Sequence, residues 1–363
     1  MPVQYESIVA EHLATRQAAG LFDVSHMGRV FVEGPQALGW LEGLLTRRVA
    51  DLAVGQARYT LVTGVDSTAV GAIDAPVILD DALVTRLADA DDGTPRLLLV
   101  VNASNCRRVI RWLESQLPSS GVRLTDRTTA TAMIAVQGPL VFGTEGLLRQ
   151  VCATETASML AALPVYGAAE TMLDETPVIV SRTGYTGEDG VELVVDAGAA
   201  VSLWERLLAA GCDRGIRACG LGSRDTLRLE AGMPLYGHEL TELTDPFAIG
   251  LGRAIELDGR TFPGAAELSA CRGAGGRQRV GLQFDGKRAA RQGDTIFPPG
   301  VDQACGEVTS GSFSPTLGSG VALAMVEPAA AVVGTELEAN VRGSRLSARV
   351  VSLPFYRRPR EAS

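Results

Sequence analysis

A glycine-rich stretch at 272–276, Arg272-Gly273-Ala274-Gly275-Gly276, divides this 363-residue chain into two parts with different patterns. Before it, apolar runs alternate with helically spaced segments; from about Arg279 onward, short strand-like segments are punctuated by glycine and proline. Glycine-rich segments typically act as linkers. The pattern predicts a mixed helix-and-strand region at 1–270 and a small barrel or sandwich domain at 278–356.

The first part contains several segments with clear structural signals. Helices are expected at 5–19, 35–45, 104–116, 201–210 and from 223 to 232, mostly ended by glycine or opened by a capping residue. The apolar run 97–101 predicts a buried strand, and the segment around 182–190 predicts a hairpin with a long loop.

Composition excludes several classes of protein. The formal net charge of −9 argues against a nucleic-acid partner, which would need cations to neutralise phosphates. No apolar run reaches the roughly 18 residues of a membrane helix, and the N-terminus lacks the basic and apolar regions of a signal peptide. Six scattered cysteines suit reduced thiols, so we expect a soluble, cytoplasmic protein, with a monomer as the default.

Familiar catalytic motifs are missing from the sequence. The three histidines, His12, His26 and His238, show no ligand spacing, so no metal site is expected. Lys287 is the only lysine and hence the only candidate for Schiff-base chemistry. The segment 281–287 nearly matches a phosphate-binding loop, but Arg288 follows where Ser or Thr would hold magnesium, and we interpret the match as a coincidence.

The loop SRTGYTGEDGVEL at 181–193 combines spaced glycines with carboxylates. Its glycines could let the backbone approach a planar ligand, and Glu192 could accept two parallel N–H bonds from an aminopyrimidine edge. The alternative is a tight hairpin whose glycines only permit positive φ, and composition alone favours that alternative.

The segment 220–239 places Arg224 in the first turn of an expected helix, where the helix dipole disfavours a cation. This mismatch indicates a ligand or a carboxylate partner, although Arg224 could also pair with Asp225 or be solvated. Arg228 and Glu230 are expected to be ordinary charges on the helix surface. A third loop, at 306–318, is rich in small residues that could pack over a pocket.

Several of these segments together resemble the aminomethyltransferase (T-protein) family of the glycine cleavage system. They are GLFDVSHMG at 20–28, SRTGYTGEDGVEL at 181–193, RDTLRLEAGMPLYG at 224–237, VTSGSFSPTLG at 308–318 and LPFY at 353–356. They occur in the family's order and cover essentially the whole chain.

The resemblance implies a fold, a reaction and two partners. The fold is an α+β cloverleaf of two interleaved α+β parts around a folate channel, plus a C-terminal β-barrel domain. The reaction moves a methylene group from the aminomethyl-lipoyl group of H-protein to tetrahydrofolate. Its products are 5,10-methylenetetrahydrofolate, ammonia and dihydrolipoyl H-protein. No metal is implied.

The resemblance also nominates contacts for the folate. Glu192 and Arg224 are the foremost candidates, and Asn102 is a further one. Tyr356 and Arg358 lie near the C-terminus, which closes the channel in the family, and Arg291 could meet the acidic tail of folate.

The sequence departs from the family pattern mainly in its first 110 residues. Aligned on Asn102 and Trp112, the family's Lys-Asp pair becomes Arg108-Val109, so the aspartate assigned to acid–base work falls on Val109, which cannot accept a proton. An aromatic that could face the pterin becomes Thr85, and several residues are inserted around 67–76.

The meaning of Val109 stays open at the level of sequence. Val109 could belong to an apolar helix stripe, with the catalytic group supplied elsewhere, for example by Asp80 or Asp81. The leading hypothesis is the aminomethyltransferase; the alternatives are a folate-dependent demethylase and a catalytically impaired folate-binding paralogue.

Overall fold

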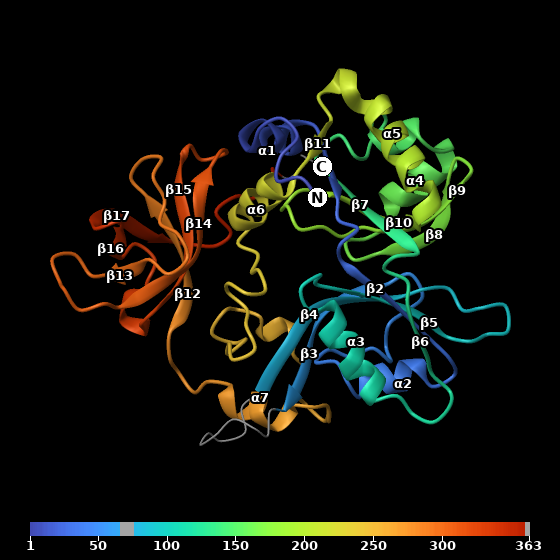
Figure 1. Cartoon of the computed structure of the whole chain (residues 1–363), viewed down its shortest axis with the longest axis horizontal. Coiled ribbons are helices and arrows are strands. Elements are labelled where there is room, and N and C mark those ends of the chain that lie inside the picture. Colours follow the sequence, from blue (N-terminus) through green and yellow to red (C-terminus); the bar gives the residue numbers. More distant parts are fainter. Residues whose placement is uncertain (66–75, 360–363) are drawn as a thin grey trace.

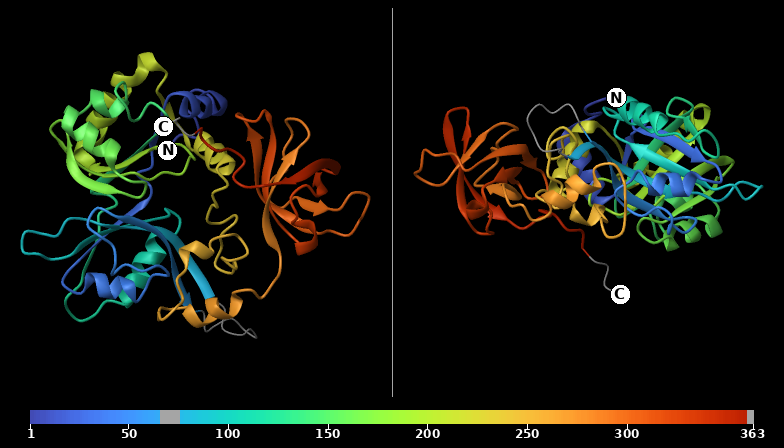
Figure 2. Two further views of the ribbon diagram at one scale, coloured as in Figure 1. Left: turned by 180° about the vertical axis from the view of Figure 1, so that it is seen from behind. Right: turned by 90° about the horizontal axis from the view of Figure 1, so that it is seen from below.

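The computed structural model describes residues 1–65 and 76–359, so the expected insertion at 67–76 falls almost entirely outside the described residues. Three lobes surround a common centre (Figure 1), and the reverse view shows the same arrangement (Figure 2). Two lobes are each built on a sheet, and the third is a closed barrel. The α+β cloverleaf implied by the family resemblance is confirmed.

The first lobe is a six-stranded sheet in the order β11-β1-β7-β10-β9-β8. All neighbouring strands are antiparallel except β1 and β11, which are parallel. The strands are β1 (Gly20–Asp23), β7 (Thr131–Gln137), β8 (Ala168–Leu173), β9 (Thr176–Ser181), β10 (Gly190–Asp196) and β11 (Arg217–Cys219). Helices α4 (Thr154–Ala162) and α5 (Ala200–Gly211) bury apolar side chains such as Leu160 and Leu203 in the core of this lobe.

The second lobe is a five-stranded antiparallel sheet in the order β3-β4-β5-β2-β6. Its strands are β2 (Gly28–Glu33), β3 (Ala57–Val65), β4 (Pro76–Arg86), β5 (Arg96–Val101) and β6 (Arg123–Asp126). The continuous apolar run of β5 is buried as expected, under helices α2 (Ala37–Glu42) and α3 (Cys106–Ser115).

The two sheets are interleaved in sequence, because the chain starts in one, builds the other and then returns. Strand β1 belongs to the six-stranded sheet, β2 to β6 form the five-stranded sheet, and β7 to β11 complete the first. A shared apolar cluster, including Phe22, Phe31 and Met133, packs the two lobes against each other. The lobes therefore share one rigid boundary along which a ligand site can form.

The C-terminal lobe is a closed six-stranded barrel in the order β12-β15-β14-β13-β16-β17. Its strands are β12 (Gln278–Phe284), β13 (Thr295–Phe297), β14 (Gly306–Ser314), β15 (Ser319–Val326), β16 (Glu336–Val341) and β17 (Ser344–Val351). The phosphate-loop-like segment 281–287 is the end of β12 and the turn after it, as expected from its sequence. Helix α7 (Ala265–Cys271) precedes the exposed glycine-rich stretch that leads into the barrel.

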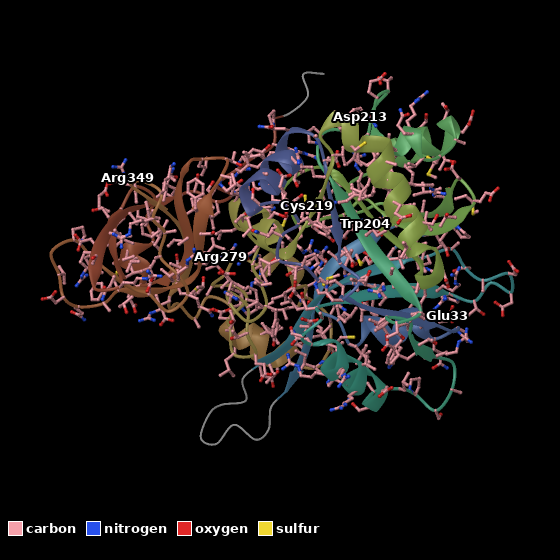
Figure 3. The ribbon with its side chains drawn as sticks, turned by 45° about the horizontal axis from the view of Figure 1, so that its top comes forward. Glu33, Trp204, Asp213, Cys219, Arg279 and Arg349 are labelled. Carbon is pink, nitrogen blue, oxygen red and sulfur yellow. The ribbon has the colours of Figure 1, made fainter. Side chains whose placement is uncertain are left out.

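Helices α1 (Ile8–Gln17) and α6 (Leu221–Glu230) join the barrel to the other lobes. Leu229 of α6 packs with Val321 and Leu323 of β15. Arg279 of β12 donates to the Gly232 carbonyl at 3.0 Å, and Figure 3 shows it between the barrel and the two sheets. None of the described helices is long and apolar enough to cross a membrane.

Arg228 and Glu230 of α6 are buried, so the expectation of ordinary surface charges is wrong. Arg228 pairs with Glu239 at 3.0 Å and donates to Ser310 of the barrel at 2.8 Å. Glu230 accepts hydrogen bonds from Arg16 of α1 at 2.9 Å and from the Thr316 hydroxyl at 2.7 Å. The sequence pattern of the helix does not show that these charges are buried, because the residues that cover them belong to the barrel, a distant part of the chain.

Candidate functional site

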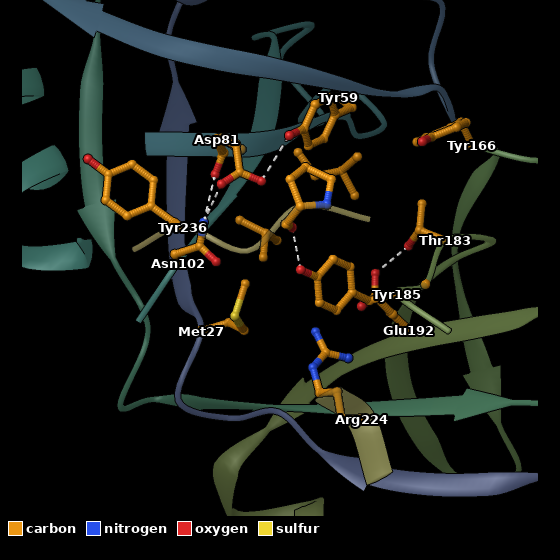
Figure 4. A pocket seen from close by; sticks show the side chains of 15 residues that line it. Met27, Tyr59, Asp81, Asn102, Tyr166, Thr183, Tyr185, Glu192, Arg224 and Tyr236 are labelled. Carbon is orange, nitrogen blue, oxygen red and sulfur yellow. Dashed lines mark hydrogen bonds between the residues drawn. The ribbon is translucent and has the colours of Figure 1, made fainter. Parts of the chain in front are cut away.

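A cavity lies between the two sheets and the segment that follows α6 (Figure 4). It encloses about 710 Å³ of empty space, its open mouth included. The five-stranded sheet supplies one wall, and the six-stranded sheet together with α6 supplies the other. The lining residues are Met27, Tyr59, Asp81, Ala82, Leu83, Val100, Asn102, Tyr166, Thr183, Gly184, Tyr185, Glu192, Arg224, Pro234 and Tyr236.

Glu192 lies on β10 and presents its carboxylate to the cavity. The Thr183 hydroxyl, in the loop between β9 and β10, donates to Glu192 Oε2. No other donor to this carboxylate is found among the described residues, which leaves Oε1 available to a ligand.

The glycine loop that follows Thr183 forms the expected β9–β10 hairpin. A Cβ on Gly184 would lie 1.8 Å from Gln137 Oε1, and Gly187 has a φ of +82°. The conformational explanation therefore holds for Gly187, which permits a left-handed turn. Gly184 does not have a positive φ; it packs closely against Gln137 of β7 and also lines the cavity.

Arg224 of α6 reaches the same wall of the cavity. Its guanidinium lies 4.9 Å from the centre of the Tyr185 ring, and its buried Nη1 has no hydrogen-bond partner among residues 1–65 and 76–359. Burial lowers the pKa of Arg224, while the negative charge of Glu192 opposes that shift. A buried guanidinium nitrogen without a partner is costly. It therefore indicates an acceptor that a ligand would bring.

Asp81 of β4 lies on the opposite wall (Figure 4). The Tyr59 hydroxyl donates to Asp81 Oδ2 at 3.0 Å, and Asn102 Nδ2 donates to Asp81 Oδ1 at 2.7 Å. Burial raises the pKa of Asp81, and these two donors only partly counter it. Asp81 is thus a carboxylate that faces a cavity and holds a proton more readily than an exposed one does.

Asp80, its neighbour on β4, is completely buried. It accepts from Asn105 Nδ2 at 2.6 Å, from Asn102 Nδ2 at 2.9 Å and from the Asn102 backbone N–H at 2.8 Å. Burial and the charge of Asp81 raise the pKa of Asp80 to about 7.

Tyrosines give the cavity flat apolar walls. Tyr185 is buried beside Arg224 and donates its hydroxyl proton to the Pro234 carbonyl. Tyr236 donates to the Ile78 carbonyl at 2.7 Å and lines the wall of the five-stranded sheet. Aromatic faces combined with a few fixed polar groups are typical of sites for planar heterocycles.

The structure brings Glu192, Arg224 and Asn102 together at the cavity, but it does not bring the other candidate ligand contacts there. Tyr356 lies under the Arg16 guanidinium, 3.8 Å from its ring centre, and Arg358 pairs with Asp189 at 3.1 Å. Arg291 is on the barrel and donates to the Gly311 carbonyl at 2.7 Å. None of these three lines the cavity.

Val109 does not occupy a catalytic position in the structure. It is fully buried in the core of the second lobe, on the side of α3 that packs against the sheet. The explanation as an apolar helix stripe is therefore the one that agrees with the structure, and Asp81 places a carboxylate on the wall opposite Glu192. Thr85 is likewise buried and does not line the cavity.

The main residues that sequence reasoning missed are the lining tyrosines and the placement of Asp81. Asp81 could have been found from the expected pairing of its strand with β5. Ala82 of β4 lies opposite Val101 of β5, so Asp81 lies beside Asn102, the residue that follows Val101. Tyr59, Tyr185 and Tyr236 come from three distant segments, and no local pattern connects them.

Comparison with known protein families gives a match over nearly the whole chain. The model described as "GCVT N-terminal domain" matches residues 1–259. The model described as "Glycine cleavage T-protein C-terminal barrel domain" matches residues 277–357.

Individual relatives agree with the family models. Proteins named aminomethyltransferase from Symbiobacterium thermophilum and Streptomyces coelicolor are each 42% identical over 366 residues, covering 99% of this chain and 92% of the relative. The crystal structure of the glycine cleavage system aminomethyltransferase T from Bartonella henselae is also similar, with a TM-score of 0.83 and 32% identity. That match covers 99% of this chain and 92% of the Bartonella chain.

Proposed function

Because this chain belongs to the glycine cleavage T-protein family of aminomethyltransferases, we propose that its cavity binds tetrahydrofolate and receives the aminomethylated lipoyl arm of H-protein. The chain is an enzyme of the one-carbon transferase class. The observation that carries the proposal is the cavity itself, with Glu192 and an unpartnered Arg224 on one wall and Asp81 on the other.

Ring recognition is assigned to the wall of the six-stranded sheet. Glu192 can accept two parallel N–H bonds from the aminopyrimidine edge of a reduced pterin, and Arg224 Nη1 can donate to its carbonyl oxygen. Tyr185 supplies a flat surface beside these groups. The residues present therefore fit a planar ligand that is rich in both donors and acceptors.

The proton chemistry is assigned to Asp81. Two folate amines bond to the methylene carbon as its C–N and C–S bonds break. Each folate nitrogen loses a proton; one proton leaves with ammonia and the other ends on the lipoyl thiol. A carboxylate with a raised pKa can take the first proton and return one. Holding the two reactants together in one cavity supplies much of the remaining acceleration.

The alternatives, a demethylase or an impaired paralogue, are not favoured. Both depended on the loss of a carboxylate at Val109, and Val109 is a core residue in this fold. Relatives named aminomethyltransferase cover 99% of the chain.

An assay with both substrates tests the proposal. We expect the protein to bind tetrahydrofolate and to form 5,10-methylenetetrahydrofolate and ammonia when aminomethylated lipoyl H-protein is added. Asp81→Asn should keep folate binding and lose about 10²–10⁴-fold in rate, as is typical for a positioned acid–base group. Wild-type protein that binds folate but transfers nothing would contradict the proposed reaction.

We further propose that the enzyme acts as a cytoplasmic monomer. H-protein would approach the open mouth of the cavity. The adjacent arginines Arg47 and Arg48 could meet an acidic partner, but they already contact Glu256, with Arg47 at 2.7 Å and Arg48 at 3.6 Å. They are therefore weak candidates for docking.

A further inference from the structure

Two consecutive aspartates of β4, directly after a β-bulge, share one amide group. Val62 of β3 pairs with Asp80 and Thr63 pairs with Ile78, so Leu79 is an extra residue on β4. Successive side chains on a regular strand point to opposite faces. Here a single atom, Asn102 Nδ2, donates to both carboxylates, at 2.9 Å to Asp80 Oδ1 and 2.7 Å to Asp81 Oδ1. Asn102 directly follows Val101, the last residue of β5 that pairs with β4, so its amide lies beside both aspartates.

The carbonyl groups at the bulge have their own donors, which fix its shape. Tyr236 donates to the Ile78 carbonyl at 2.7 Å, and Arg108 Nη2 donates to the Leu79 carbonyl. Arg108 Nη2 also contacts the Tyr236 hydroxyl at 2.6 Å. The segment before the two aspartates is therefore held by α3 on one side and by the segment after α6 on the other.

Within the part of the chain that the structure describes, no cation forms an ion pair with either of the two carboxylates. Arg108 is the nearby cation of α3, but its ion pair is with Glu242, and none of the ion pairs among the described residues includes Asp80 or Asp81. The other titratable groups around the pair, among the described residues, are neutral at neutral pH or acidic. They are Tyr59 of β3, Cys106 of α3, Tyr185 of the β9–β10 loop, and Tyr236 and Glu242 of the segment after α6. Two adjacent buried carboxylates without a cation cannot both stay charged at little cost.

We propose that Asp80 is a positioning residue of the transfer reaction: through Asn102 it aims Asp81 into the cavity, and its presence makes the two carboxylates share one proton. This inference rests on the proposed function. Asp81 can release this shared proton to the leaving amine and take a proton back from the attacking folate amine. Asp80 itself is completely buried and is absent from the cavity lining, so it acts only through Asp81.

The pH profile of kcat/KM tests this role, because its acidic limb reports the ionisation of the free enzyme. In the wild type the limb should lie above the ordinary carboxyl range of about 4. Asp80→Asn should move the limb to lower pH by about one unit or more, since the like charge is gone. The exposed Asp91→Asn is the matched control and should leave the limb in place.

Asn105→Ala should move the acidic limb in the opposite direction from Asp80→Asn. It therefore tests the same role if Asp80→Asn folds poorly. Asn105 donates only to Asp80 and does not line the cavity. Removing this donor weakens the anionic form of the pair, so the limb should move to higher pH. A merely structural role would lower the rate at every pH and move neither limb.

An NMR titration of ¹³C-labelled aspartate side chains measures the pair without any turnover. We expect two coupled carboxyl carbons, one titrating well above 4, and in Asp80→Asn a single titration of Asp81 at lower pH than in the wild type. If the wild type is active but the acidic limb of kcat/KM is unshifted in both variants, the role of Asp80 is overturned and the proposed reaction stands. An inactive wild type whose NMR titration still shows the coupled pair would instead overturn the proposed reaction.

Discussion

Glu192 is the residue whose replacement should most directly reduce the affinity for the ligand. It accepts one hydrogen bond, from Thr183, and otherwise faces the cavity. Hydrogen bonds to a charged group contribute about 1.5–3 kcal/mol. We therefore expect Glu192→Ala to weaken tetrahydrofolate binding about 10–100-fold, measured by calorimetric titration.

Tyr356→Phe is the matched control for this measurement. The Tyr356 ring lies under Arg16 and outside the cavity. The affinity of the Tyr356→Phe variant for tetrahydrofolate should therefore stay within about twofold of wild type. Equal losses in both variants would mean that Glu192 acts through the fold rather than as a ligand contact.

Val109 allows a test that separates a lost catalytic group from a core residue. Val109→Asp would bury an unpaired carboxylate under α3, at a cost of about 3 kcal/mol or more in the free energy of unfolding. We expect a lower midpoint in urea and no gain in transfer rate. Arg111→Asp, on the exposed side of the same helix, introduces the same side chain and should cost about 0.5 kcal/mol or less.

At the scale of elements, sequence patterns predicted strands and helices better than they predicted which faces are covered. The buried run of β5, the β9–β10 hairpin and the helical segment containing Arg224 all lie where their local patterns placed them. The charges of α6 did not, because Arg228 and Glu230 face barrel residues more than 80 positions away. The bulge in β4 also leaves no signature in composition, since only the pairing with β3 reveals the extra residue.

Glu230, the last residue of α6, makes that element sensitive to acid. Burial opposes its charge, but hydrogen bonds from His12 and Ser314 and the charge of Arg16 lower its pKa to about 2. A depressed carboxyl pKa contributes stability above about pH 4.5 that is lost as the pH falls toward 2. The contribution is on the order of 3 kcal/mol.

We therefore expect Glu230→Gln to be less stable than wild type at pH 7, with the difference shrinking between about pH 4.5 and 2. Urea unfolding followed at several pH values measures it. Glu205→Gln, an exposed change on α5, should show no such trend. A difference that stays constant with pH would show that the hydrogen bonds of Glu230 matter but its charge does not.

At the scale of the whole molecule, the glycine-rich stretch predicts a boundary between two parts of the chain, but it does not indicate how firmly the barrel is attached. The interleaving of the two sheets followed only from the family resemblance, because no local pattern shows that β1 pairs with β7 and β11. The attachment of the barrel depends on tertiary contacts of α6: buried polar pairs to Ser310 and Thr316 and an apolar cluster around Leu229.

Limited trypsin digestion tests both the division and the attachment. Arg272 and Arg277 are exposed in an irregular segment between α7 and β12, so we expect first cleavage there, giving fragments that end near 272–277. The nicked pieces should still elute together in gel filtration, because the α6 contacts do not depend on the linker. Early cleavage should disappear in the Arg272→Gln, Arg277→Gln double variant. Pieces that separate after nicking would show that the linker, rather than α6, holds the barrel in place.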